Sequence, residues 1–315
     1  MDAPRIAIVL PCYNEQEVLP STARTLLSLL DRFAAEGLVA PDSYILCSND
    51  GSRDATRRII AELHAADPRV KGITLAHNRG QQAALLAGLM TVRERCDAAI
   101  TIDADLQDNP EMMADMVRLF REGKDIVYGV RSSRDADSWF KRVSAQSFYK
   151  FQSAMGLQTI YNHADYRLMS RRALDILSQY GESNLYLRGI MPDIGLQTAV
   201  VEYARTERTA GESKYPLCKM LALSIDGITS FTAKPMRIIF LTGFALLLVD
   251  IVVALWVLYV HMAHHTVSGW SSLMLSVWFL GSLILMAIGI VGEYIGKIFV
   301  EVKARPRYNI EEEVF

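Results

Sequence analysis

The chain has 315 residues, of which 51% are hydrophobic, and its formal net charge is -2 at neutral pH. This length suits one large domain or two modest ones, and the nearly balanced charge gives no basis for nucleic-acid binding. The four cysteines lack the paired spacing of zinc or redox sites, so we expect buried thiols in a reducing cytoplasm. The first apolar run, Ile6–Leu10, is too short for a signal peptide and is followed by Pro11, which predicts that the polar part of the chain stays cytoplasmic.

Residues 5 to about 180 alternate short β-rich runs with amphipathic stretches. The predicted strands are Arg5–Leu10, Ser43–Ser48, Val70–Ala76, Ala98–Ile102 and Ile126–Val130. The predicted helices are Glu17–Glu36, Asp54–Ala66, Gln81–Arg95 and Glu111–Glu122. Strand–helix alternation at this spacing predicts an α/β fold with a mostly parallel sheet that is covered on both faces.

Two carboxylates follow the fourth predicted strand. Asp103 and Asp105 are two residues apart, so in extended chain they point the same way. Open α/β sheets bind their ligands at the carboxyl edge of the strands. Hard oxygen ligands that leave open positions are how Mg²⁺ is usually held beside phosphates. The alternative is a solvated acidic loop, which the preceding strand and the following Gln107 to Pro110 make less favoured.

Other polar loops are predicted at the same edge. Tyr13 follows the first strand and offers a ring for stacking a base, and Asp50 follows the second and can accept a hydrogen bond from a base, although Asn-Asp-Gly-Ser is also an ordinary turn. Residues 77–82, which include Arg79, could aim a cation and a helix N-terminus at phosphate. Arg131 ends the fifth strand and could bind phosphate or form a surface ion pair.

Two later segments add candidate residues. Asp165 begins a predicted short strand that leads into a helix. It could bind a base or a sugar hydroxyl, or it could instead pair with Arg167 or cap a turn. Arg208, Ser213 and Lys214 flank a glycine in a segment that suits a mobile loop closing over an anion, with a solvated polar loop as the alternative.

The last third of the chain is strongly apolar. Residues 238–260 and 271–293 are each long enough to cross a hydrocarbon core of ~30 Å at ~1.5 Å per residue, with Asp250 interrupting the first run. Lys and Arg flank the pair and are missing from the loop between them, so both ends are predicted to be cytoplasmic. Residues 216–232 are predicted to form an interfacial amphipathic helix. The predicted organisation is a cytoplasmic domain 1–210, a loop and interfacial helix 211–236, two transmembrane helices within 237–296, and a cytoplasmic tail 297–315.

Five motifs occur together in order along the chain. They are Pro11-Cys12-Tyr13-Asn14-Glu15, Asn49-Asp50-Gly51-Ser52, His77-Asn78-Arg79-Gly80, Asp103-Ala104-Asp105-Leu106-Gln107-Asp108, and Arg208 with Gly211-Glu212-Ser213-Lys214-Tyr215. This set resembles glycosyltransferase family 2, and within it the polyisoprenyl-phosphate glycosyltransferases, such as dolichyl-phosphate mannose synthase and bacterial bactoprenol glucosyltransferases. Gly292-Glu293-Tyr294-Ile295-Gly296 and Arg305-Pro306-Arg307-Tyr308 resemble the bacterial subgroup with two spans.

The resemblance implies a GT-A (Rossmann-like) fold, a nucleotide-sugar donor and a polyprenyl-phosphate acceptor. The residues that it would assign to the nucleotide are Pro11, Tyr13, Glu15, Asp50, Arg79 and Asp103. Those that it would assign to Mg²⁺ or Mn²⁺ are Asp103, Asp105 and Gln107. Those that it would assign to donor or acceptor phosphates are Arg131, Arg208, Ser213 and Lys214, and the catalytic set would be Asp105, Asp165 and Arg131.

The Glu-Asp dyad that supplies a base in other family 2 enzymes is not evident near residues 180–195. A phosphate monoester has a second pKa near ~6 and is largely a dianion at neutral pH, so it can attack an anomeric carbon without a base. On this hypothesis Asp165 orients the sugar or the acceptor, with a role as base left open.

The resulting hypothesis is an inverting transfer of a hexose, with glucose favoured, from a UDP-sugar to undecaprenyl phosphate on the cytoplasmic leaflet of the bacterial inner membrane. The alternatives are the same reaction with GDP-mannose or another donor, and a catalytically silent, membrane-anchored scaffold that binds nucleotide sugars. Two spans are too few for a processive synthase with its own channel, and a chain that is mostly α/β does not suit a transporter. Small residues in the second run predict a homo-oligomer, a tetramer included.

Overall fold

The computed structural model describes residues 3–131, 163–182, 187–203 and 269–315, together with single positions between 239 and 255. The chain divides into two compact units. The sheet unit comprises Met1–Tyr149, Gln158–Lys214 and Ala304–Phe315, and the helical unit comprises Lys150–Leu157 and Tyr215–Lys303. The predicted residues Arg208, Ser213 and Lys214, the interfacial helix and most of the first apolar run lie outside the described residues.

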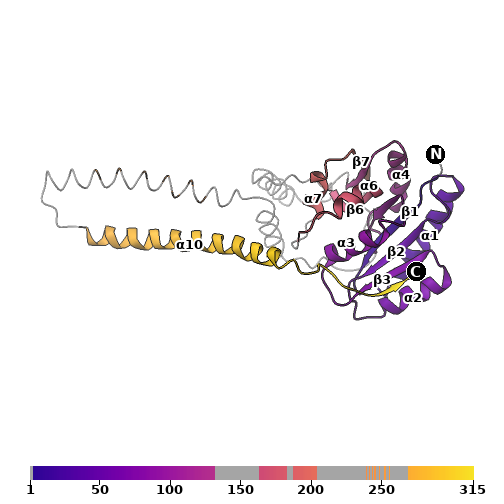
Figure 1. Cartoon of the computed structure of the whole chain (residues 1–315), viewed down its shortest axis with the longest axis horizontal. Coiled ribbons are helices and arrows are strands. Elements are labelled where there is room, and N and C mark those ends of the chain that lie inside the picture. Colours follow the sequence, from indigo (N-terminus) through magenta and orange to yellow (C-terminus); the bar gives the residue numbers. More distant parts are fainter. Residues whose placement is uncertain are drawn as a thin grey trace. The chain divides into compact units, whose positions relative to one another are not determined.

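One eight-stranded sheet organises the sheet unit (Figure 1), with the order β7-β5-β6-β4-β1-β2-β3-β8. Its strands are β1 Ile6–Cys12, β2 Tyr44–Asn49, β3 Val70–Leu75, β4 Ala98–Thr101, β5 Ile126–Arg131, β6 His163–Ser170, β7 Thr198–Tyr203 and β8 Ile310–Val314. Pairing is parallel except where β6 pairs with β4 and β5 and where β8 pairs with β3. The mixed, mainly parallel sheet confirms the α/β part of the predicted fold class.

Helices cover both faces of this sheet. They are α1 Leu19–Ala35, α2 Thr56–Ala66, α3 Gln81–Val92, a 3₁₀ turn Pro110–Met112, α4 Met113–Arg121, α6 Arg171–Leu177 and α7 Leu187–Asp193. The buried residues of α1 recur at spacings of three and four, which gives it one apolar face. In α3 every residue from Ala83 to Leu89 is buried, so this helix is enclosed on several sides.

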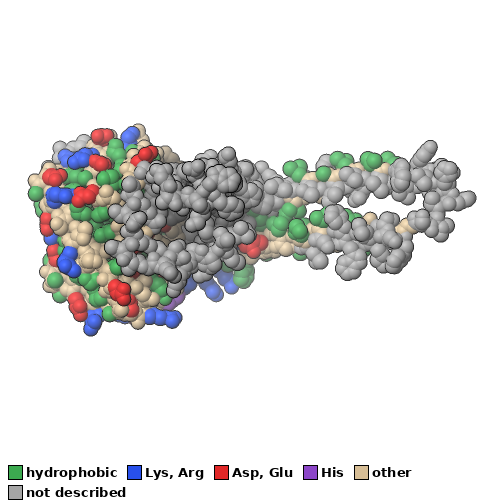
Figure 2. Space-filling view, turned by 180° about the vertical axis from the view of Figure 1, so that it is seen from behind, with side chains coloured by type: hydrophobic (Ala, Val, Ile, Leu, Met, Phe, Trp, Pro, Cys, Tyr) green, Lys and Arg blue, Asp and Glu red, His purple; other side chains and the backbone are tan. Residues whose placement is uncertain are grey.

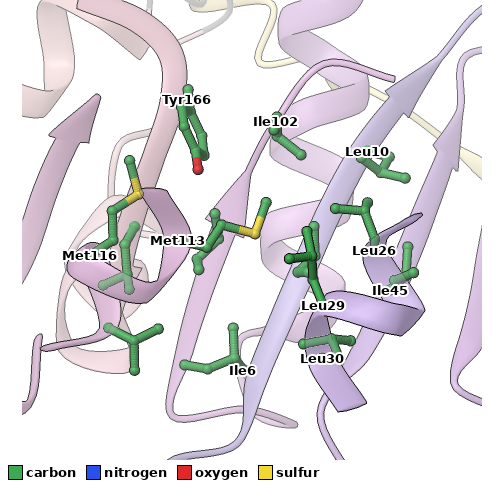
Figure 3. Packing of buried hydrophobic residues seen from close by; sticks show 14 of the residues in the cluster. Ile6, Leu10, Leu26, Leu29, Leu30, Ile45, Ile102, Met113, Met116 and Tyr166 are labelled. Carbon is green, nitrogen blue, oxygen red and sulfur yellow. The ribbon is translucent and has the colours of Figure 1, made fainter. Parts of the chain in front are cut away.

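The two faces of the sheet follow from the alternation of side chains along β1. Ile6, Ile8 and Leu10 belong to the core that α1 and α4 cover, where Met113 and Leu26 join them (Figure 3). Side chains of the intervening residues face the other way, toward α3. There a Cβ added at Gly88 would lie 2.5 Å from Val9 Cγ1, so the absence of a side chain at Gly88 lets α3 lie directly on the sheet.

The five predicted strands and four predicted helices are all present, with ends shifted by a few residues. The predicted strand and helix at residues 165–172 are also present, as β6 followed by α6. The insertion of β6 between β4 and β5 was not predicted from the sequence, and neither were β7 and β8.

Strand β8 lies within the segment that was expected to be only a cytoplasmic tail. It extends the sheet beside β3, and the backbone N–H of Ala76 donates to the carbonyl of Asn309 at 3.0 Å. Arg57 pairs with Glu311 at 3.5 Å and with Glu312 at 2.6 Å. The end of the chain is therefore part of the sheet unit.

The helical unit contains α10, Trp270–Val302, which includes the second predicted span and extends past it. Within the residues that the structure describes, no helix offers an apolar stretch long enough to cross a membrane.

Candidate active site

Four loops follow the carboxyl ends of β1, β2, β3 and β4, which are neighbours in the sheet. The pairing of β1, β2 and β3 is level at this end, with Cys12 opposite Asn49 and Asn49 opposite Thr74, whereas the pairing of β4 ends with Thr101 opposite Val9. Parallel pairing thus brings together loops that are up to 90 residues apart in the sequence, and it places the motif residues at one edge, where open α/β sheets bind ligands.

The first two loops hold each other through side chain to backbone hydrogen bonds. The N–H of Asn14 donates to Ser52 Oγ at 3.0 Å, and Asn14 Oδ1 accepts from the N–H of Arg53 at 2.9 Å. Asn14 has a φ of +56°, a left-handed conformation that asparagine tolerates better than most residues. Beside it, Tyr13 is 42% exposed, which leaves its ring accessible for the stacking that the sequence predicts.

Asp50 is buried at 3% exposure and binds the backbone of the third loop. Its two carboxylate oxygens accept from the N–H groups of Arg79 at 2.7 Å and Gly80 at 2.8 Å. Burial raises the pKa of Asp50, while these two hydrogen bonds and the nearby His77 lower it. The contact that the structure shows for Asp50 is therefore the fixing of the turn that precedes α3, and its predicted contact with a base stays a prediction.

Gly51 makes the close approach of the second and third loops sterically feasible. Its φ is +61°, and a Cβ there would lie 2.8 Å from both the backbone nitrogen of Asn78 and the carbonyl carbon of His77. A residue with a side chain at position 51 would displace backbone atoms of the third loop, because the atoms nearest to its Cβ all belong to the backbone.

The fourth loop carries Asp103, Asp105 and Gln107. Gln81, on the first turn of α3, donates to Asp103 Oδ1 at 2.9 Å, and the side-chain amide of Gln107 donates to Asp105. Between them Leu106 has a φ of +47°, which is unusual for a residue with a side chain and marks a sharp reversal of the backbone. Gln107 is buried whereas Asp105 is exposed.

Two neighbouring elements, α1 and β6, bind the backbone of this loop through hydrogen bonds. Thr22 of α1 donates to the carbonyl of Ala104 at 2.6 Å, and the hydroxyl of Tyr166 on β6 donates to the carbonyl of Asn109 at 3.1 Å. Both supporting side chains are buried, so the carboxylates are on a loop whose backbone is anchored at two points.

The donor set suits a hard divalent cation, because Asp103, Asp105 and the amide of Gln107 supply oxygen atoms. Among the described residues no three His, Cys, Asp or Glu side chains cluster closely enough to hold a metal by themselves. A cation at this loop would need further ligands from a bound phosphate and water. Glu15 lies close by, and its pKa is raised by burial and by the negative charges of Asp105 and Asp54.

Asp165 forms a buried ion pair on β6. Its carboxylate accepts from Arg167 at 2.6 Å, and the two side chains are 7% and 2% exposed. The side chain of Thr101 on β4 donates to the backbone carbonyl of Asp165. The structure thus shows the pairing with Arg167 that the sequence left open. Contact of Asp165 with a base or a sugar hydroxyl stays a prediction.

The remaining predicted residues are placed less completely. Pro11 is partly buried in β1, and Arg79 is exposed beside the N-terminus of α3. Arg131 is the last residue of β5, and its side chain lies outside the described part of the chain. Gln81 and Gln82 belong to the segment that the sequence predicts to bind phosphate, but neither side chain was predicted to have a role of its own. Their signal was their position directly after a glycine turn, at the start of a helix that enters this edge of the sheet.

Comparisons with known proteins agree on one family. Residues 7–178 match the model of Glycosyl transferase family 2. The chain is 48% identical over 312 residues to the uncharacterized glycosyltransferase YkoT of Bacillus subtilis. This alignment covers 99% of this chain and 93% of the relative. It is 38% identical over 309 residues to the bactoprenol glucosyl transferase of Shigella phage SfX, and the alignment covers 98% of this chain and 99% of the relative. It is 37% identical over 309 residues to the prophage bactoprenol glucosyl transferase homolog of Escherichia coli, with 98% of each covered.

Proposed function

Because the chain belongs to glycosyl transferase family 2, we propose that it transfers a hexose, with glucose favoured, from a UDP-sugar to polyprenyl phosphate. Membership of the family confirms the resemblance that the motifs indicated. The observation that carries the proposal is the match over nearly the full length of both chains to proteins named bactoprenol glucosyl transferase, at 37–38% identity. Such a match covers the apolar C-terminal part as well as the sheet unit, which a shared nucleotide-binding domain alone would not explain.

In the proposed reaction an oxygen of the acceptor phosphate attacks the anomeric carbon of the donor sugar. The bond between that carbon and the UDP oxygen breaks, and a single displacement of this kind inverts the anomeric centre. The acceptor needs no base, because a phosphate monoester with a second pKa near ~6 is largely a dianion at neutral pH. The main task of the protein is then to position the two reactants and to stabilise the leaving diphosphate.

The residues at the sheet edge would divide this task. Tyr13 would stack on the uracil, and the anchored loop with Asp103 and Asp105 would face the diphosphate. Mg²⁺ or Mn²⁺ held there would neutralise charge on the leaving group. Arg131, Arg208, Ser213 and Lys214 would bind the phosphates. Asp165, held by Arg167, would orient the sugar or the acceptor.

We further propose that the apolar runs at 238–260 and 271–293 span the membrane, with the sheet unit and both termini in the cytoplasm and with subunits associated through the spans. Support comes from α10, on which several large apolar side chains are exposed in the isolated chain (Figure 2). Examples are Leu273, Met286, Phe299 and Val300, which lie on different sides of the helix. A helix that presents apolar side chains on several sides requires lipid or protein around it.

The test is a transfer assay with the full-length protein in detergent or vesicles. The assay supplies undecaprenyl phosphate, Mg²⁺ or Mn²⁺ and a panel of labelled donors that includes UDP-glucose and GDP-mannose, and it counts label in the organic phase. We expect label from one donor, its loss on chelation, and its loss in Asp105→Asn. Nucleotide binding without transfer from any donor would refute the enzyme and favour a binding scaffold. Label from GDP-mannose alone would replace the donor and keep the reaction class.

A further inference from the structure

The first turn of α3 contains a glutamine that joins two separate parts of the sheet unit. Gln82 Nε2 donates to Asp165 Oδ2 at 3.4 Å, and Gln82 Oε1 accepts from the backbone N–H of Leu187 at 3.2 Å. Asp165 belongs to β6, and Leu187 is the first residue of α7. One partly buried side-chain amide therefore bridges a carboxylate of the candidate site and the start of a helix more than 100 positions away in the sequence.

Both hydrogen bonds use the specific chemistry of an amide. The N–H of Leu187 is in the first turn of α7, where backbone N–H groups have no acceptor within the helix. Asp165 pairs with Arg167, and its carboxylate oxygens accept hydrogen bonds. The side chain at position 82 must consequently donate in one direction and accept in the other, which glutamine does and which leucine or an ionised glutamate does not.

We propose that Gln82 is a positioning residue for sugar transfer: it fixes the Asp165 carboxylate and the start of α7 relative to the loops that bind the nucleotide. This inference rests on the proposed function, because it assumes that Asp165 contacts the sugar or the acceptor.

The anchoring of α3 gives this bridge a rigid base. Asp50 binds the backbone N–H groups of Arg79 and Gly80 just before the helix, and α3 is buried from Ala83 to Leu89. In the same turn Gln81 donates to Asp103, on the side of the proposed metal loop. The first turn of α3 thus contacts both sides of the site: Gln81 binds Asp103, and Gln82 binds Asp165.

Two substitutions test the bridge. Gln82→Leu removes both hydrogen bonds at similar size, and Gln82→Glu keeps the shape but places an ionised carboxylate against Asp165. A control with the same change of charge is Gln179→Glu, at an exposed position near the end of α6. We expect both variants at position 82 to lower kcat by about 10- to 100-fold with little change in the KM for the donor, because misplacement of a group near the reaction costs rate. The control is expected to match the wild type.

The pH profile of Gln82→Glu separates positioning from simple packing. Charged groups that the described contacts bring to this turn are Asp165 directly, Arg167 through Asp165, and Asp103 through Gln81. The adjacent negative charge of Asp165 and partial burial raise the pKa of the introduced carboxyl above its ordinary value of about 4.3. Below that raised pKa the neutral carboxyl can donate to Asp165 and accept from Leu187, so activity relative to the wild type should rise as the pH falls. Gln82→Leu should show no such recovery.

Hydrogen exchange in a peptide that covers residues 187–193 gives a readout that does not depend on activity. We expect faster exchange in both variants than in the wild type and in the control. If kcat and exchange are unchanged in both variants, or if Gln82→Glu shows no recovery toward low pH, the bridge has no positioning role. If the wild type transfers no sugar, the proposed function fails, and the exchange result alone then decides whether Gln82 orders α7.

Discussion

Gly51 offers the sharpest test of how the candidate site is built. Replacing it by alanine requires a left-handed residue with a side chain, which costs about 1–2 kcal/mol. The new Cβ would also lie 2.8 Å from backbone atoms of His77 and Asn78, and such overpacking typically adds about 1–3 kcal/mol. Gly37 is the matched control, because its φ is +65° and nothing lies within 4 Å of a Cβ there. The difference between the two variants isolates the contact between the loops.

We expect Gly51→Ala to lose about 2 kcal/mol more stability than Gly37→Ala, which corresponds to a further drop of about 4–8 °C in unfolding temperature for a unit of this size. Thermal unfolding followed by circular dichroism measures this difference. Titration with UDP is the second measurement, and only Gly51→Ala should weaken binding, because its loop would have to move away from the segment that Asp50 fixes. Equal losses in the two variants, within about 0.5 kcal/mol, together with unchanged UDP affinity, would refute the close packing of the two loops.

Three further predictions concern the surroundings of the site. Thr22→Val removes the hydrogen bond to the carbonyl of Ala104 at constant side-chain size. This should lower the free energy of unfolding by about 1–3 kcal/mol and weaken activation by Mn²⁺ in the transfer assay. Full activation with wild-type stability would count against the anchoring of that loop. Deleting residues 310–315 removes β8 and the backbone hydrogen bonds that pair it with β3. Since several hydrogen bonds of ~1 kcal/mol each are lost, the unfolding temperature should fall by at least about 4 °C. An unchanged unfolding temperature would show that β8 contributes nothing to stability. Asp67 has its pKa lowered chiefly by its hydrogen bonds with Arg69, so its ion pair stabilises the fold above the ordinary aspartate pKa of about 3.9, and this contribution is lost as the pH falls through the lowered value. Asp67→Asn should therefore be less stable than the wild type at pH 7, with the difference shrinking in acid; a difference that is independent of pH would contradict this assignment.

The sequence alone determined the local elements and the identity of the loops. Short apolar, β-rich runs indicated the strands from β1 to β5, and amphipathic stretches indicated the helices between them. The expected amphipathic pattern is absent from α3, in which every residue from Ala83 to Leu89 is buried. The sequence also placed the polar motifs directly after strands. Since parallel strands end at one edge, this was sufficient to predict that Tyr13, Asp50 and Asp103 lie on neighbouring loops.

The tertiary structure decided which long-range partners those elements take. β6 inserts antiparallel between β4 and β5, and β8 pairs with β3 from the far end of the chain. Neither pairing leaves a local signal, and β8 contains three consecutive glutamates, a composition that strands usually lack. Strand pairing across so many residues depends on the whole sheet being assembled.

The same is true of the hydrogen bonds that shape the site. Asp50 binds backbone N–H groups of the third loop, Thr22 holds Ala104, and Gln82 bridges Asp165 to Leu187. These contacts depend on how loops with left-handed residues turn in space. The sequence identified the carboxylates and amides at this edge because their chemistry is local. Only the folded chain shows which of them orient others, because a hydrogen bond requires two groups to be placed within about 3 Å of each other by separate elements.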